Sequence, residues 1–97
     1  MDCAFCKIAA GELPSTIEYQ DDEVMAFRDI HPSAPVHVLV IPKKHIDNLL
    51  ELEKFSIFEK VKRVVKKLNL INYKIVINGG DLQEVKHFHI HLMSERG

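Results

Sequence analysis

Short apolar runs separated by polar turns recur along the chain, and this pattern predicts strands. Val36–Ile41 is a β-branched run that Pro42 ends, and Asp21-Asp22 is a turn between two shorter runs. The last run is the most regular, because apolar residues alternate with others over nine positions. The predicted strands are 17–20, 24–28, 36–41, 73–78 and 85–93.

Two segments have helical spacing instead. Residues 51–68 carry apolar side chains three and four apart, with Lys and Glu between them, which predicts a long amphipathic helix. Residues 4–10 predict a short helix that Gly11 ends. The expected fold is therefore α+β, with a mainly antiparallel sheet of about five strands, one long helix and a short N-terminal helix.

Length and composition narrow the function classes. The chain has 97 residues, so residues 1–97 are expected to form a single domain. Its net charge is -1, which gives no reason to expect a nucleic-acid partner. No apolar run approaches the ~18 residues that span a bilayer, and no signal peptide is recognisable at the start. A cytoplasmic protein without a membrane partner is the expectation.

Three histidines alternate with apolar residues in the last predicted strand. His87, His89 and His91 would share one face there, about 6.6–7 Å apart along the backbone. One interpretation is a half-exposed strand without chemistry. Another is a metal site, since closely spaced imidazoles can bind zinc. A third is nucleophilic catalysis by a neutral imidazole, with its neighbours handling protons.

Cys3 and Cys6 have C-x-x-C spacing near the start of the chain. A structural disulfide is not expected in a reducing compartment. The spacing then leaves a metal-binding pair, a redox pair, or two small apolar side chains without chemistry.

The chain resembles the histidine-triad (HIT) family, and its Hint branch most closely. The run His87-Phe88-His89-Ile90-His91-Leu92-Met93 matches the motif His-φ-His-φ-His-φ-φ, in which φ is apolar. Further matching segments are 3–8, 11–15, 26–30 and 34–45, the last of which contains Pro42-Lys43-Lys44-His45. The resemblance covers nearly the whole chain and implies the HIT-like fold.

The resemblance implies a nucleotide hydrolase. Members bind purine nucleoside monophosphates or their conjugates and cleave at the α-phosphorus, as in nucleoside phosphoramidates and adenylate conjugates. His89 matches the nucleophile that forms a nucleotidyl-histidine intermediate, and His91 and His37 match its catalytic partners. A dinucleoside polyphosphate hydrolase, or a nucleotide-binding scaffold with little turnover, remains an alternative. His37 could also be a hydrogen-bonded core histidine.

Other residues match the family's nucleotide contacts. Phe27, Asp29 and Ile30 correspond to the nucleoside pocket, although Asp29 before His31-Pro32 also suits a plain turn. Asn78 and Gln83 correspond to the phosphate loop. Glu84 stands where the branch often has a serine that donates to phosphate, and a carboxylate there would repel the phosphate unless it turned away.

The resemblance also implies a second site and a partner. Cys3 and Cys6, with His45 and His87, match a structural zinc site that ties the N-terminal helix to the sheet. A closed set of four ligands is structural rather than hydrolytic. His87 would then belong to zinc and not to catalysis. A homodimer is expected, with the long helix and the strand at 73–78 as its interface.

Overall fold

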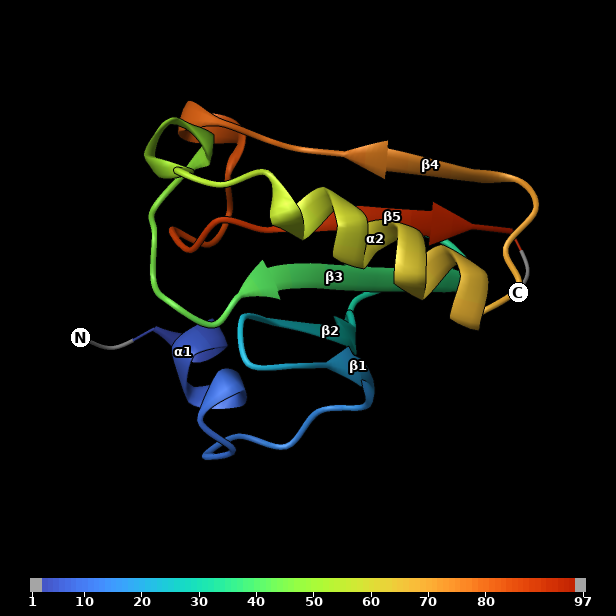
Figure 1. Cartoon of the computed structure of the whole chain (residues 1–97), viewed down its shortest axis with the longest axis horizontal. Coiled ribbons are helices and arrows are strands. Elements are labelled where there is room, and N and C mark those ends of the chain that lie inside the picture. The colour runs from blue at the N-terminus through green and yellow to red at the C-terminus, as the bar shows by residue number, and fades with distance from the viewer. Residues whose placement is uncertain (1–2, 96–97) are drawn as a thin grey trace.

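The computed structural model describes residues 3–95 and contains one five-stranded antiparallel sheet (Figure 1). The spatial strand order is β1-β2-β3-β5-β4, so β1 and β4 form the two edges. The helices are α1 (Ala4–Ala9) and α2 (Ser56–Lys67), with 3-10 turns at Leu49–Glu51 and Gly80–Leu82. The strands are β1 (Ile17–Gln20), β2 (Val24–Arg28), β3 (Val36–Pro42), β4 (Tyr73–Val76) and β5 (Ile90–Ser94). The predicted α+β fold class is thus confirmed.

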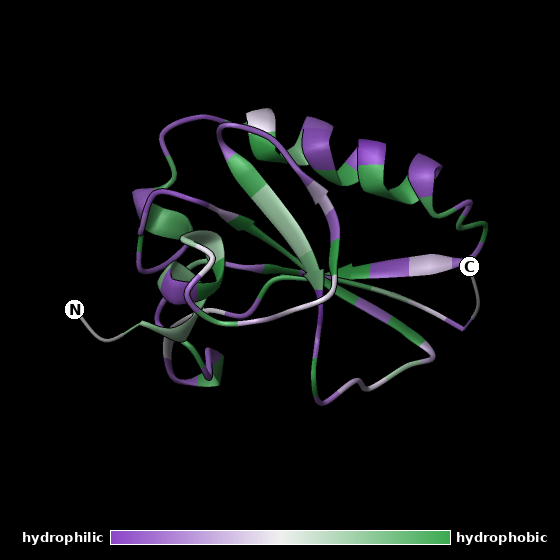
Figure 2. Cartoon of the chain, turned by 90° about the horizontal axis from the view of Figure 1, so that it is seen from below, coloured by the Kyte–Doolittle hydropathy of each residue, from purple (hydrophilic) through white to green (hydrophobic). Residues whose placement is uncertain are grey.

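Helix α2 covers one face of the sheet. Ile57, Val61 and Val64 form its buried stripe, and Figure 2 shows the hydrophobic side of α2 toward the sheet and its hydrophilic side away. Strand residues with the same orientation complete this core, as the period of two along a strand requires. They are Val24, Ala26, Val36, Val38, Val40, Ile90 and Leu92, joined by Phe88 just before β5.

A second, smaller core lies on the opposite face of the sheet. There Phe5 of α1 and Cys3, the residue that caps this helix, pack against Met25 and Phe27 of β2 and against Leu39 and Ile41 of β3. The histidine side chains of the triad segment point to this face, because Phe88, Ile90 and Leu92 point to the other. The imidazoles are therefore largely covered rather than exposed, and His87 is fully buried.

The long helix is shorter than its spacing predicted. Asn48 accepts a hydrogen bond from the Leu50 amide and starts a separate 3-10 turn, after which Leu52 is extended. The helical period is broken there, and α2 begins only at Ser56. Phe55 is consequently 73 % exposed instead of belonging to the buried stripe.

The last strand is also shorter than predicted. It begins at Ile90 instead of Val85, and only Ile90–Ser94 pairs with β3 and β4. Upstream of Ile90 the backbone bonds elsewhere, since the Phe88 amide donates to the Ile46 carbonyl oxygen. Pro42, which ends β3, has no amide hydrogen with which to continue the ladder. The alternation of faces nevertheless continues through the triad, so the prediction was wrong in extent and right in orientation.

Strand β4 ends at Val76, two residues earlier than predicted, and leaves Asn78 in a loop.

No helix within residues 3–95 combines the length and apolar character needed to cross a membrane.

Candidate active site and metal centre

A cavity of about 700 Å³ opens on the face that carries α1. Its walls come from α1, the segment before β1, β2 with the loop that follows it, β3, and the triad segment. Seven of the residues predicted for the nucleotide site line it. They are Phe27, Asp29, Ile30, His37, Asn78, His89 and His91.

His89 presents a free nitrogen to this cavity. Its Nδ1 lies 2.8 Å from the His87 carbonyl oxygen, which can only accept a hydrogen bond. The ring therefore carries its proton on Nδ1, and Nε2 keeps a lone pair. The Phe5 ring stands edge-on to the imidazole, with centroids 5.3 Å apart, and holds it from the α1 side.

His37 and His91 form a hydrogen-bonded pair beside His89. The Ser33 amide donates to His37 Nδ1 over 2.9 Å, so neutral His37 carries its proton on Nε2. This nitrogen lies 2.8 Å from His91 Nδ1 and donates to it. Neutral His91 then has its own proton on Nε2. The chain of bonds makes His91 a hydrogen-bond donor toward the cavity.

The surroundings of His91 favour its neutral form. Burial, with added repulsion from His89 and His37, lowers the pKa of His91 below its ordinary value of 6.5. A hydrogen-bond donor at His91 next to the free Nε2 of His89 suits attack on an electrophile. The His89 and His91 rings are in contact, with their centroids 4.9 Å apart.

Asp29 stabilises a turn and also lines the cavity. Its Oδ1 accepts from the His31 amide over 2.8 Å, as in the plain-turn interpretation. Its Oδ2 lies 3.5 Å from His37 Nε2. Ile30 lies at the rim and is 80 % exposed, whereas Phe27 is buried.

Asp29, His37 and His91 also bring three potential metal-ligand atoms within 4.8 Å of one another. A metal ion on His37 Nε2 would have to displace the proton that the Ser33 hydrogen bond places there. The tautomer therefore favours hydrogen bonding over metal binding at this cluster.

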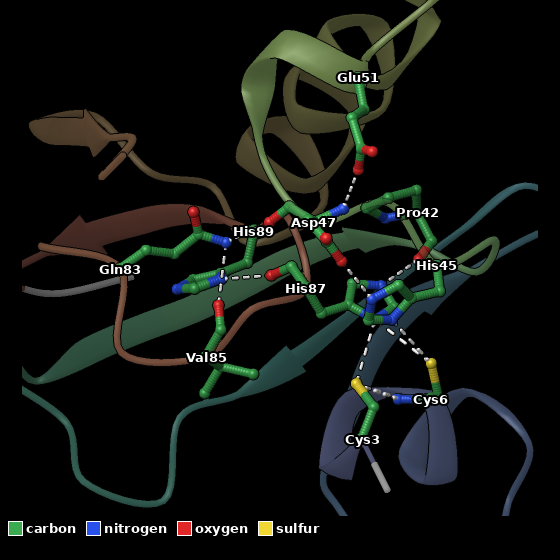
Figure 3. Close-up of polar contacts among 10 residues, drawn as sticks. All are labelled: Cys3, Cys6, Pro42, His45, Asp47, Glu51, Gln83, Val85, His87 and His89. Carbon is green, nitrogen blue, oxygen red and sulfur yellow. Dashed lines mark hydrogen bonds and ion pairs between the residues drawn. The ribbon is translucent and has the colours of Figure 1, made fainter. Parts of the chain in front are cut away.

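Gln83 is not among the residues that line the cavity. Its side-chain amide donates to the backbone carbonyl oxygens of Asp47 and Val85 (Figure 3). The residue is buried, and it fastens the loop before the triad to the loop after His45. The structure thus places Gln83 beside the expected phosphate site and not in it, because its donor group is used by the backbone.

Glu84, the next residue, does line the cavity. It is exposed, and its negative charge acts on the pKa of His91 in the raising direction. Arg28 also lines the cavity, but its guanidinium Nε is 2.6 Å from Glu18 Oε2. Asp29 and Glu84 are the two carboxylates of the cavity wall whose charges act on the pKa of His91 in the raising direction.

Four side chains gather at a second cluster next to the cavity. The two cysteine sulfurs and one ring nitrogen from each of His45 and His87 lie within 4.8 Å of one another. The Sγ–Nδ1 distances are 3.4 Å for Cys3–His87, 3.2 Å for Cys6–His45 and 3.5 Å for Cys6–His87 (Figure 3). Tetrahedral zinc with ordinary Zn–S and Zn–N bonds separates such ligand atoms by about 3.6 Å. The donor set fits a zinc ion.

The outer nitrogens of both histidines are already fixed. His87 Nε2 donates to the Pro42 carbonyl oxygen and His45 Nε2 to Asp47 Oδ1, each over 2.8 Å. Both Nδ1 atoms are thereby left as ligands, in the arrangement that usually supports zinc-bound histidine. Burial lowers the pKa of His87 and keeps it neutral.

The cysteines are free thiols, and Cys3 is inclined toward the thiolate form. Although burial favours the neutral thiol, the hydrogen bond from the Cys6 amide lowers the pKa of Cys3. A thiolate is the form that binds metal.

Several residues of the two sites carry little signal in the sequence. Phe5 and Ile8 line the cavity from α1, and their i, i+3 spacing could have indicated a shared face. Ser33 and Asp47 fix the tautomers of His37 and His45 through contacts that only the folded loops create.

Comparison with known proteins identifies the family of the chain. The family model described as HIT domain matches residues 10–97. The chain belongs to the HIT family.

Some of the proteins similar to this chain have names that describe an activity or a ligand. A protein of Brassica juncea named 14 kDa zinc-binding protein is 41% identical over 98% of this chain and 94% of its own length. Adenylylsulfatase HINT1 of Arabidopsis thaliana is 41% identical over 95% of this chain and 70% of its own length. The solved structure of a histidine triad protein from Clostridium difficile has a TM-score of 0.89 and 42% identity, covering 96% of this chain and 90% of that one.

Proposed function

We propose that this protein is a purine nucleotide-binding hydrolase that cleaves at the α-phosphorus of nucleoside phosphoramidates or adenylate conjugates. The observation that carries the proposal is the tautomer of His89. Its Nδ1 is committed to the His87 carbonyl oxygen, so the Nε2 lone pair faces a cavity lined by His37 and His91. The similarity to an adenylylsulfatase supports a nucleotide substrate.

The reaction has two displacement steps. His89 Nε2 forms a bond to the α-phosphorus, while the bond from phosphorus to the leaving group breaks and the leaving group takes up a proton. Water then attacks the nucleotidyl-histidine, breaks the P–N bond, and releases the nucleoside monophosphate and a proton. His91, held as a donor by His37, stabilises charge on a phosphoryl oxygen in both steps.

The nucleoside occupies the opposite end of the cavity in this proposal. Phe27 and Ile30 supply apolar surface to the base, and the free oxygen of Asp29 accepts from the ribose hydroxyls. We assign Asn78, which lines the cavity, a contact with phosphate, and Gln83 a supporting role through its hydrogen bonds to the loop backbone.

Hydrolysis of adenosine 5′-phosphoramidate tests the catalytic assignment. We expect His89→Ala to lower the rate by at least about a thousandfold, since it removes the nucleophile. Binding of AMP should survive, which separates loss of chemistry from loss of fold. Leu50→Ala is the control and should keep full activity, because Leu50 is 92 % exposed and does not line the cavity. Full activity of the His89 variant would show that the nucleophile is wrong.

We also propose that Cys3, Cys6, His45 and His87 hold a structural zinc ion. The distances, the fixed tautomers and the similarity to a zinc-binding protein support it. A reducing cytoplasm, where thiols stay free, is the compartment that suits this site. Elemental analysis of the purified protein should find one zinc per chain, and its absence would contradict the four-ligand proposal.

We further propose a homodimer formed through β4. This edge strand exposes Tyr73 and Ile75, and the preceding Ile71 is 85 % exposed. An uncovered apolar edge strand favours pairing with another strand. A second copy of the chain could extend the sheet there.

A further inference from the structure

Helix α1 belongs to both sites. Cys3 and Cys6, at its start and in its middle, contribute two of the four potential metal ligands. Ala4, Phe5 and Ile8, interleaved with those cysteines, line the cavity. One short element therefore forms part of the metal cluster and part of the cavity wall.

The helix is too short to be stable by itself. It has only six residues, whereas isolated helices below about 12–15 residues are marginal in water. Its N-cap is the Cys3 sulfur, which accepts from the Cys6 amide over 3.4 Å. A ligand that binds both sulfurs would fix the cap and the first turn together.

Phe5 connects this helix to the proposed nucleophile. Its ring packs edge-on against His87, with centroids 5.9 Å apart, and against His89 at 5.3 Å. It also packs edge-on against Phe27 in the cavity, at 5.4 Å. One buried ring thus contacts a residue of the metal cluster, His87, and two residues of the cavity, His89 and Phe27.

A second connection runs through the backbone. His87 contributes Nδ1 to the cluster, while its carbonyl oxygen fixes the tautomer of His89. Asp47, which orients His45, accepts through its own carbonyl oxygen from Gln83 (Figure 3). Gln83 in turn holds Val85, a residue of the cavity wall.

We propose that occupancy of the Cys3–Cys6–His45–His87 cluster by a divalent metal raises the affinity of the cavity for a nucleoside monophosphate, with Phe5 as the positioning residue between the two. The inference rests on the proposed nucleotide site, and it gives the metal at the neighbouring cluster a regulatory role. Coupling of this kind is reciprocal, so the bound nucleotide must tighten metal binding by the same factor.

Calorimetric titration with AMP tests the coupling on zinc-loaded protein and on protein stripped with a chelator. We expect the loaded form to bind AMP about tenfold more tightly. In the reverse experiment, saturating AMP should raise the affinity for zinc, measured against a competing chelator, by the same factor. Equal AMP affinity in both forms would overturn the coupling. Failure of the loaded protein to bind AMP would instead overturn the proposed function.

Phe5→Leu tests the route while keeping all four ligands. We expect this variant to bind one zinc per chain, with AMP changing its zinc affinity less than twofold. Phe55→Leu is the matched control, because Phe55 is 73 % exposed and lies outside both sites. If circular dichroism shows that the stripped wild type is unfolded, the effect of AMP on the zinc affinity of the Phe5 variant decides the question alone. Full coupling in Phe5→Leu would show that the ring is not the connection.

Discussion

The three histidines of the triad differ in the hydrogen-bond partners of their ring nitrogens. His87 donates to the Pro42 carbonyl oxygen and turns Nδ1 to the cysteines. His89 donates from Nδ1 and turns Nε2 to the cavity. His91 accepts at Nδ1 from His37. In the proposed function, one residue type at a regular spacing thereby serves as metal ligand, nucleophile and hydrogen-bond donor, because each ring meets a different partner.

Glu84 is the residue whose charge is least suited to a phosphate site. Replacing it by Gln removes a negative charge from the cavity wall, and we expect AMP to bind about threefold more tightly at low salt. Titrations with AMP at two salt concentrations measure the effect, which should shrink as salt rises. Asp81→Asn changes the same charge in the same loop outside the cavity and is the control. An equal gain in both variants would indicate a general charge effect.

At the scale of elements, α2 is fastened to the β1–β2 hairpin by a polar cluster. Asp21 accepts from Lys60 over 2.6 Å, from the Tyr19 hydroxyl over 2.7 Å, and from the amides of Glu23 and Val24. Burial opposes ionisation of Asp21, but these donors outweigh it and hold the pKa of the carboxyl well below its ordinary value of 3.8. The charged carboxylate therefore stabilises the fold.

The stabilisation by Asp21 depends on pH. A carboxyl whose pKa is depressed on folding contributes fully above about pH 4 and loses that contribution as pH falls toward its folded pKa. We expect Asp21→Asn to lower the free energy of unfolding by about 1.5–3 kcal/mol at pH 7, and by less at pH 3. Urea unfolding at both pH values measures this. Asp22→Asn, at an exposed neighbour, should have little effect; a similar loss there would count against the cluster.

At the scale of the whole molecule, the two sheet edges differ in what surrounds them. Strand β4 lies beside β5 at one edge of the sheet, and its apolar side chains Tyr73 and Ile75 are exposed. Strand β1 is the other edge, and Ile17 there is about as exposed as Ile75 on β4. Ile75 and Ile17 therefore allow a matched test of the proposed dimer, with one residue at each edge of the sheet.

Light scattering after size exclusion measures that dimer. We expect the wild type to have twice the mass of one chain and Ile75→Lys to shift toward the monomer, since a charge at a pairing edge opposes association. Ile17→Lys should leave the mass unchanged. A monomeric wild type, or equal dissociation by both variants, would contradict pairing through β4.

The sequence by itself determined the fold class and the common face of the three triad histidines. These follow from local rules: a period of two in strands and a period near 3.6 in helices. The residues of both proposed sites were indicated instead by the resemblance to the HIT family. The motif match also anticipated that His87 joins Cys3, Cys6 and His45, and the structure brings these four together.

Only the tertiary structure decided where β5 and α2 begin, which nitrogen of each histidine is free, and where Gln83 points. Each of these depends on hydrogen bonds made by loops, some between residues distant in sequence and some between near neighbours. The Phe88 amide pairs with Ile46, Ser33 fixes His37, and Asp47 takes the donor of Gln83. Hydrogen bonds across folded loops leave no periodic trace in the chain, so spacing alone could not reveal that Phe5 contacts both sites.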